Sequence, residues 1–123
     1  MAAKLTSDER IARMTLSSVY PLYRQKVERK GRGEAELKTI LAWFLAVQLE
    51  EFDALLAEPI SFEALFQNRQ LCAETELVGG SICGIRIADI DNELTQKVRR
   101  LDKIVDELAQ GKALSKIMRK LDV

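Results

Sequence analysis

The stretch EAELKTILAWFLAVQLEEFDALLA, residues 34–57, decides the fold class. Its apolar residues recur three and four positions apart, which places them along one side of an α-helix. Two glutamates lie in its first turn, where the helix dipole favours negative charge. The spacing predicts either one helix ending at Ala57 or two helices with a bend near Val47.

Two helices are expected before this stretch. Ser7 is a suitable cap for the first, which is expected to end near Thr15. Ser17 or Ser18 suits the second helix. With Ser18 as the cap, Pro21 falls in the first turn, where its missing N–H costs no helical hydrogen bond. We therefore expect Pro21 near the start of the helix and not in its middle.

Apolar residues in these two helices indicate which sides face the core. The first helix has a small apolar edge formed by Ile11 and Met14. The stripe expected to face the core in the second helix comprises Val19, Leu22, Tyr23 and Val27.

Glycine, proline and serine mark further helix ends. Gly31 and Gly33 are expected to end the second helix, and Pro59 ends the stretch 34–57. Ser61 can then cap a short helix that carries two phenylalanines and a leucine. The residues that follow, up to position 81, have the composition of a loop.

The second half begins with an extended segment and ends in helices. Residues 82–87 are β-branched and apolar, so they form either a short strand or a buried connector. Since one short strand cannot make a sheet alone, we expect a connector over 78–88. Asp89 or Asp91 then caps a long helix, and Gly111 interrupts it where the apolar stripe shifts phase.

Composition predicts a single helical domain over residues 1–123 in the cytoplasm. The 123 residues are 47% hydrophobic and 31% charged, a globular balance. The start lacks the apolar segment of a signal peptide, and no apolar run approaches the roughly 20 residues that span a bilayer. Cys72 and Cys83 are too few for a disulfide framework. We expect an all-α orthogonal bundle of five or six helices.

Charge is distributed unevenly along a chain whose net charge is zero. Residues 1–33 carry eight basic and three acidic groups, a net charge of +5, and residues 95–123 carry eight and four, a net charge of +4. Residues 34–66 have a net charge of −6 and residues 67–94 of −3. Either the basic ends neutralise the acidic middle, or they converge on an anionic partner.

A basic and aromatic segment is the main candidate for such a partner. Arg24 to Arg32 contains five basic residues, and two tyrosines precede it on the same helix. Basic groups can hold phosphates, and exposed tyrosines can stack on bases. Otherwise the tyrosines pack in the core. The candidate binding residues are Tyr20, Tyr23, Arg24, Lys26, Arg29, Lys30, Arg32, Arg86, Arg99, Arg100 and Lys103.

Catalytic motifs are scarce. The sequence has no histidine, which removes the commonest general base and metal ligand. It has no phosphate-binding loop and no cysteine spacing typical of zinc, so no metal or cofactor is expected. A thiol at Cys83 near Arg86 leaves an enzyme as one alternative, because a guanidinium lowers a thiol pKa. An inert cysteine in an apolar segment is the alternative that we favour.

The leading hypothesis is a non-catalytic binding or interaction module, which self-association would also fit. Trp43, Phe44 and Phe52 are the candidate interaction surface, since an exposed aromatic cluster marks contact sites. The alternatives are a nucleic-acid-binding protein that uses the basic helix ends and the small enzyme using Cys83. No membrane partner is expected.

Five segments resemble a bacterial family, domain of unknown function 2200. They are RIARMT (10–15), SVYPLY (18–23), ERKGR (28–32), CGIRI (83–87) and LDKIVDELAQGKA (101–113). The chain departs from the family in two places. The family has a Gly-Tyr step where Ala46-Val47 stand here, and often a proline at Asn92. The resemblance implies a small helical bundle with steep packing angles, and it supplies no catalytic residues.

Overall fold

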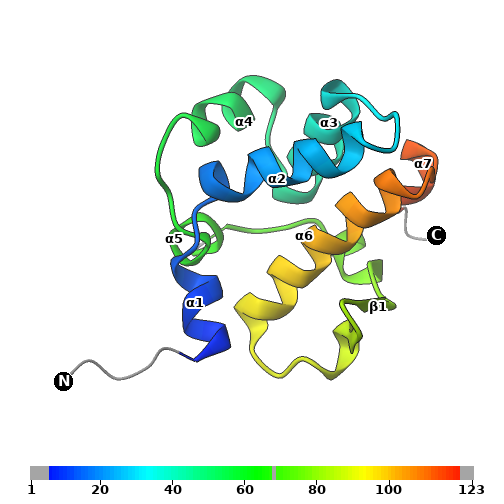
Figure 1. Ribbon diagram of the computed structural model, residues 1–123. Helices are drawn as coiled ribbons and strands as arrows, with labels where there is room; N and C mark the ends of the chain where they lie inside the picture. The colour runs from blue at the N-terminus through cyan, green and yellow to red at the C-terminus, as the bar shows by residue number, and fades with distance from the viewer. Residues whose placement is uncertain (1–5, 68, 120–123) are drawn as a thin grey trace.

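The structure of the protein, a computed structural model, describes residues 6–67 and 69–119 (Figure 1). Within them, seven α-helices are joined by loops, two short 3-10 helices and one hairpin. The α-helices are α1 (Ser7–Arg13), α2 (Leu16–Glu28), α3 (Glu34–Leu45), α4 (Leu49–Leu56), α5 (Phe62–Phe66), α6 (Glu93–Ala109) and α7 (Leu114–Ile117). The 3-10 helices are η1 (Ala73–Leu77) and η2 (Ile87–Asp89), and the strands are β1 (Ser81–Ile82) and β2 (Ile85–Arg86). The expected all-α class is confirmed, but the expected number of five or six helices is too low, because short helices such as α7 form separate elements.

Helix α6 is the element against which most of the others pack. It contacts α2 and α3 along its length, with α1 and α5 near its start and α7 at its end (Figure 1). Leu101, Ile104 and Leu108 of α6 are fully buried in the common core. Burying side chains of this size stabilises the fold by about 1.5–3 kcal/mol each. None of the helices in the described part of the chain has the length and apolar composition that a bilayer crossing requires.

Three helix starts differ from the expected residues. Thr6, not Ser7, caps α1 and forms a reciprocal capping box with Glu9. Asn92, not Asp89 or Asp91, caps α6 by accepting a hydrogen bond from the Thr95 N–H at 2.9 Å. At α1 the local sequence selects Thr6, because Glu9 lies three residues later and completes the capping box.

The start of α2 is the third difference. Thr15, not Ser17 or Ser18, caps this helix, because the chain at Thr15 pairs with the segment before α5. Pro21 consequently lies inside the helix, and the expectation that it would lie in the first turn is wrong. The carbonyl of Ser17 therefore has no helical N–H four residues later.

Three helices end in the same way. After α2, α3 and α6, a residue in the left-handed conformation is followed by a backbone N–H that bonds back across the last turn. The left-handed residues are Gly31, Ala46 and Gly111, with φ of 82°, 59° and 97°. The break at Ala46 makes residues 34–57 two helices, the second of the alternatives, and the interruption at Gly111 is confirmed.

The segment 81–86 is a hairpin and not a buried connector. Strands β1 and β2 pair antiparallel through a two-residue turn at Cys83 and Gly84. Both turn residues have positive φ, which matches the right-handed twist of short hairpins. Ile82 is buried, but Cys83 and Ile85 are exposed. The expectation of a buried cysteine is therefore wrong, because the segment turns on itself at the surface.

Candidate functional site

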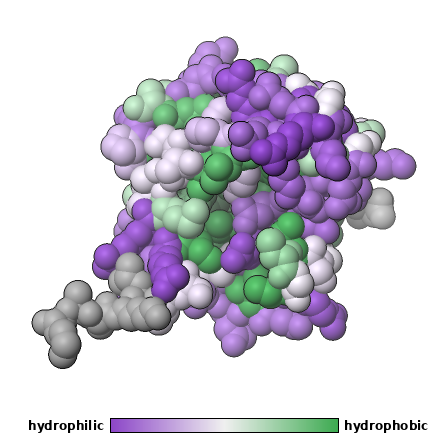
Figure 2. Space-filling model, viewed as in Figure 1, coloured by the Kyte–Doolittle hydropathy of each residue, from purple (hydrophilic) through white to green (hydrophobic). Residues whose placement is uncertain are grey.

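A groove between α1, α2 and α6 is the candidate functional site. Its cavity volume is about 220 Å³, and fully buried Phe62 contributes to its lining. Met14 follows α1, and Leu22 lies on α2, with exposed fractions of 40% and 62%. Figure 2 shows hydrophobic surface in the hollow between these helices, with hydrophilic surface around it. Large apolar side chains left exposed beside a hollow mark an interaction site.

A polar group forms one wall of the groove. The hydroxyl of Tyr23 donates a hydrogen bond to the carboxylate of Asp102, which also pairs with Arg99 at 3.2 Å. Burial raises the pKa of Asp102 above its usual value, although Tyr23 and Arg99 act in the opposite direction. Burial and the neighbouring carboxylate both raise the pKa of Tyr23. The wall therefore presents a fixed, neutralised ion pair in which Arg99 is the outermost group.

Positive charge exceeds negative charge around the groove. Arg10 lies one turn before Met14 on α1, and Arg29 lies two turns after Leu22 on α2, so each shares a side with its apolar neighbour. Both are exposed, and within the described residues neither lies in an ion pair. Lys26 pairs with Asp106 at 3.1 Å, which neutralises that acid. Asp102 and Asp106 are thus paired. Arg10 and Arg29 outnumber the remaining nearby acid, Asp8, whose carboxylate accepts a hydrogen bond from the Thr95 hydroxyl at 2.7 Å.

The two candidate tyrosines lie in the core. Tyr23 and Tyr20 are both buried, and the Tyr20 hydroxyl donates a hydrogen bond to Glu34 at 2.6 Å. Burial and then this hydrogen bond raise the pKa of Tyr20. The Tyr20 ring packs edge-on against Phe52 at 6.0 Å. Of the two alternatives for these rings, packing in the core is therefore the one observed, and accessibility for base stacking is contradicted.

The basic residues of α2 and of the loop after it contact different groups. Arg24 pairs with Glu28 and with Glu34 of α3, away from the groove. Arg32 pairs with Glu36 at 2.7 Å and donates to the carbonyls of Leu108 and Lys112, so it closes the C-terminal end of α6. That hydrogen bond to Glu36 raises the pKa of Arg32. Lys30 is exposed at the end of α2.

The candidate residues of α6 and the hairpin also bond to different groups. Arg100 donates to the carbonyl of Val78 at 3.2 Å, and Lys103 donates to that of Ser81 at 2.9 Å. Arg86 is three-quarters exposed and lies 3.9 Å from Asp89. Only Arg99 lines the groove. The eleven candidates therefore do not form one patch, and their binding of nucleic acid stays a prediction.

The expected aromatic interaction surface is absent from the described residues. Phe44 and Phe52 are fully buried, so the expectation that they would be exposed is wrong. Trp43 is partly buried and packs edge-on against Phe44 at 6.3 Å. All three side chains belong to the core or its edge because α4 folds back onto α3 after the break at Ala46.

The cysteine alternative gains no geometric support. Cys83 is exposed at the tip of the hairpin turn and does not line the groove. Arg86, on the partner strand, is oriented toward Asp89. An enzyme at this position would need a cleft beside the thiol, and the two-residue turn supplies none.

The groove residues were not all identifiable from the sequence. Met14 and Leu22 were assigned to apolar stripes facing the core, and Arg10 was not singled out. On a helical projection, Leu22 lies at the margin of the buried stripe of α2, and this position partly indicates its exposure. The sequence does not show that α1 ends before it covers this margin.

The comparisons identify the family. A model of uncharacterised proteins conserved in bacteria, DUF2200, matches residues 10–119. A comparison with curated proteins gives no match. The crystal structure of an uncharacterised protein, SP1917, is similar, with a TM-score of 0.83, 31% sequence identity and coverage of 94% of each chain. Because the family match spans most of the chain, the protein belongs to the DUF2200 family.

Proposed function

We propose that the protein is a non-catalytic binding module that holds a short, acidic, amphipathic helix of a partner protein in the groove between α1, α2 and α6. The observation that carries the proposal is the exposure of Met14 and Leu22 on either side of an apolar hollow. An amphipathic helix inserts apolar side chains into such grooves at spacings of three and four residues. Methionine suits this role because its flexible side chain adapts to different partners.

The charge around the groove favours an acidic partner. Arg10 and Arg29 are without a carboxylate within the described ion pairs, and Arg99 forms the outer edge of the polar wall. Acidic residues flanking the apolar side of the partner helix would face these guanidinium groups. Complementary charge of this kind raises the association rate and excludes wrong partners.

A second copy of the chain fits the groove less well. A two-fold interface would bring the same surface of both copies together. The surplus arginines of one copy would then face those of the other, and like charges in an interface are unfavourable. The test must therefore distinguish self-association through this surface from the binding of a partner helix.

The test uses three fluorescent helical peptides. The first has leucines at positions i, i+4 and i+7, glutamates beside them and alanines and glutamines elsewhere. The second has lysines in place of the glutamates, and the third has alanines in place of the leucines. Fluorescence anisotropy at low salt should show the first peptide binding about tenfold more tightly than either of the others. Its affinity should fall as salt is added, since exposed charges are screened.

Two results would overturn the proposal. Equal binding of the glutamate and lysine peptides would remove the charge argument, and no binding of the glutamate peptide would remove the groove as a helix-binding site. Sedimentation of the protein alone tests the second copy. A stable dimer that is disrupted by Leu22→Glu would assign the groove to self-association and contradict the proposal.

A further inference from the structure

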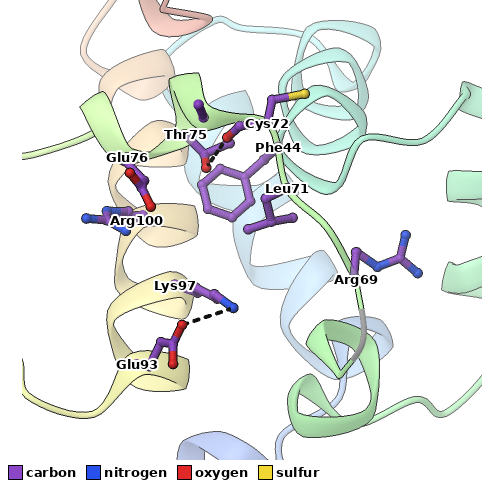
Figure 3. A pocket seen from close by; sticks show the side chains of 10 residues that line it. Phe44, Arg69, Leu71, Cys72, Thr75, Glu76, Glu93, Lys97 and Arg100 are labelled. Atoms are coloured by element: carbon purple, nitrogen blue, oxygen red, sulfur yellow. Dashed lines mark hydrogen bonds and ion pairs between the residues drawn. The ribbon is translucent and has the colours of Figure 1, made fainter.

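Two adjoining hollows lie on the flank of α6 away from the groove. Their volumes are about 170 Å³ and 290 Å³, and both are lined by Glu93 and Lys97. Glu93, Lys97 and Arg100 follow one another at helical spacing along this flank. The opposite wall of the first hollow is formed by residues between Arg69 and Thr75, which lie across from α6 (Figure 3).

The floor of the hollows is apolar. Phe44 and Leu71 line the first hollow, and Phe66 and Leu94 line the second. The rings of Phe44 and Phe66 pack edge-on at 6.3 Å, so one aromatic floor underlies both. Phe44 is fully buried and Phe66 nearly so, and both are therefore fixed by the core. Leu71 and Leu94 are only partly buried, so they present the apolar surface that suits the body of a small molecule.

Lys97 supplies a charge above this floor. Its side chain is only 26% exposed, and its Nζ lies 3.9 Å from Oε1 of Glu93, a carboxylate that is itself 85% exposed. No shorter polar contact to this Nζ occurs within the described residues. Figure 3 shows the side chain extending from α6 toward the segment that carries Leu71. A mostly enclosed ammonium with one distant, solvent-exposed partner can exchange that partner for a ligand anion.

Two arginines flank the same hollow. The Nε of Arg69 donates to the carbonyl of Leu65 at 2.8 Å, and the Nε of Arg100 donates to that of Val78 at 3.2 Å. Both guanidinium groups thus bond to backbone carbonyls. Because a carbonyl is neutral, these hydrogen bonds do not neutralise the positive charge of either arginine. Glu76 and Glu93 are the acids of the first hollow. Three cations and two carboxylates therefore line the first hollow, which favours one further negative charge. The second hollow adds the carboxylate of Glu63, so the charged end of a ligand belongs in the first.

We infer that these hollows bind a small monocarboxylate with an apolar body. The carboxylate replaces Glu93 at the Nζ of Lys97, and the body lies against the partly exposed side chains of Leu71 and Leu94. A phosphate fits less well, because it carries more charge and needs several donors, whereas the arginine Nε groups are already engaged with carbonyls. A neutral molecule would leave the ammonium without a closer partner.

The test is an NMR titration of the ¹⁵N-labelled full chain with phenylacetate. We expect saturable shifts at the amides of Leu71, Thr75 and Lys97, with a dissociation constant roughly in the millimolar range. Matched probes are 2-phenylethanol, which keeps the body without the charge, and acetate, which keeps the charge without the body. Each should bind about tenfold more weakly. Equal binding of either probe, or shifts confined to other parts of the chain, would overturn the inference.

Substitutions test whether the carboxylate of the ligand binds at Lys97. Lys97→Met keeps the apolar stem and should weaken phenylacetate binding by about tenfold or more. Glu93→Gln removes the competing carboxylate and should strengthen it. Lys30→Met, on the exposed end of α2, is the matched control and should change nothing. Unchanged affinity in Lys97→Met, with a native circular dichroism spectrum, would contradict the inference. Leu22→Ala should also have no effect, since this site is independent of the groove.

Discussion

The hydroxyl of Tyr23 on α2, a buried side chain, donates a hydrogen bond to the partly buried carboxylate of Asp102 on α6. This contact joins two helices whose residues are distant in sequence, and it forms one wall of the apolar groove. It also explains how a carboxylate is accommodated beside the core, since an unpaired buried charge would be strongly destabilising.

Tyr23→Phe should lower the free energy of unfolding by about 1–3 kcal/mol near neutral pH. Burial raises the pKa of Asp102, so the stability that this group contributes is present below its unfolded pKa and is lost as pH rises through the folded pKa. Removing the Tyr23 hydroxyl raises the folded pKa of Asp102 further, because its hydrogen bond lowers that pKa. The loss should therefore be largest at neutral pH and small in acid, as urea unfolding at several pH values can measure.

Tyr20→Phe is the matched control for that prediction. Its hydroxyl bonds to Glu34, a carboxylate in contact with solvent that can find water instead. The loss should be smaller than for Tyr23→Phe and should depend less on pH. Equal losses in the two variants would contradict the account of the wall.

Glu107→Gln should destabilise the end of α6. Arg119 donates two hydrogen bonds to this carboxylate, at 2.6 Å and 2.7 Å, and Lys112 donates a third at 3.0 Å. Burial raises the pKa of Glu107, but these partners together outweigh it, so the pKa lies below its usual value. The stability is therefore present above the unfolded pKa and is lost as pH falls through the folded one. We expect a loss of about 1–3 kcal/mol at neutral pH.

The same substitution should cost little in acid, where Glu107 is protonated in the parent protein. Asp53→Asn, which alters an ion pair with Lys38 at the surface, should have a smaller effect at every pH. A pH-independent loss in Glu107→Gln would show that packing, and not charge, governs this site.

Ala46→Gly should stabilise the protein by about 0.5–1 kcal/mol. Ala46 occupies a left-handed position with φ of 59°, where α2 and α6 have glycine at the equivalent turn. An L-residue is strained there because its Cβ approaches the following carbonyl oxygen. Thermal unfolding would detect the gain. The control, Ala54→Gly inside α4, should instead destabilise by about 1 kcal/mol.

Cys83→Asn should also stabilise, by less than about 1 kcal/mol. Cys83 has φ of 52° at the first position of a two-residue turn, and Asn-Gly is the preferred sequence there. Cys83→Ala, which keeps a β-carbon at the same position without the amide that favours a left-handed conformation, should give no gain. Equal melting temperatures for both variants would argue against strain at Cys83.

Helical periodicity predicted most of the elements. The stripe in residues 34–57 allowed a break, Ser61 was expected to cap α5, and Gly111 was expected to separate α6 from α7, as the structure shows. These features depend on residues close together in sequence. The possible bend near Val47 lies one residue from the observed break, but the sequence could not decide between one helix and two, since Ala46 carries no sequence signal for a left-handed turn.

Features set by tertiary contact were harder to predict. Thr15 caps α2 because it pairs with Ser61, a contact between distant segments. Leu22 belongs to the apolar stripe by spacing but is left exposed beside the groove. The candidate cations are identifiable from the sequence by their charge alone. Which group each one binds depends on the carboxylates and carbonyls that the fold brings near it.

The most direct measurement of the central claim compares two exposed leucines. Leu22 lies beside the groove and Leu49 begins α4, and their exposed fractions of 62% and 48% are similar enough for a matched pair. Anisotropy titrations with the glutamate and leucine peptide should show Leu22→Ala weakening binding by about tenfold, while Leu49→Ala leaves it unchanged. Equal affinities for the two variants would contradict the assignment of the groove as the binding site.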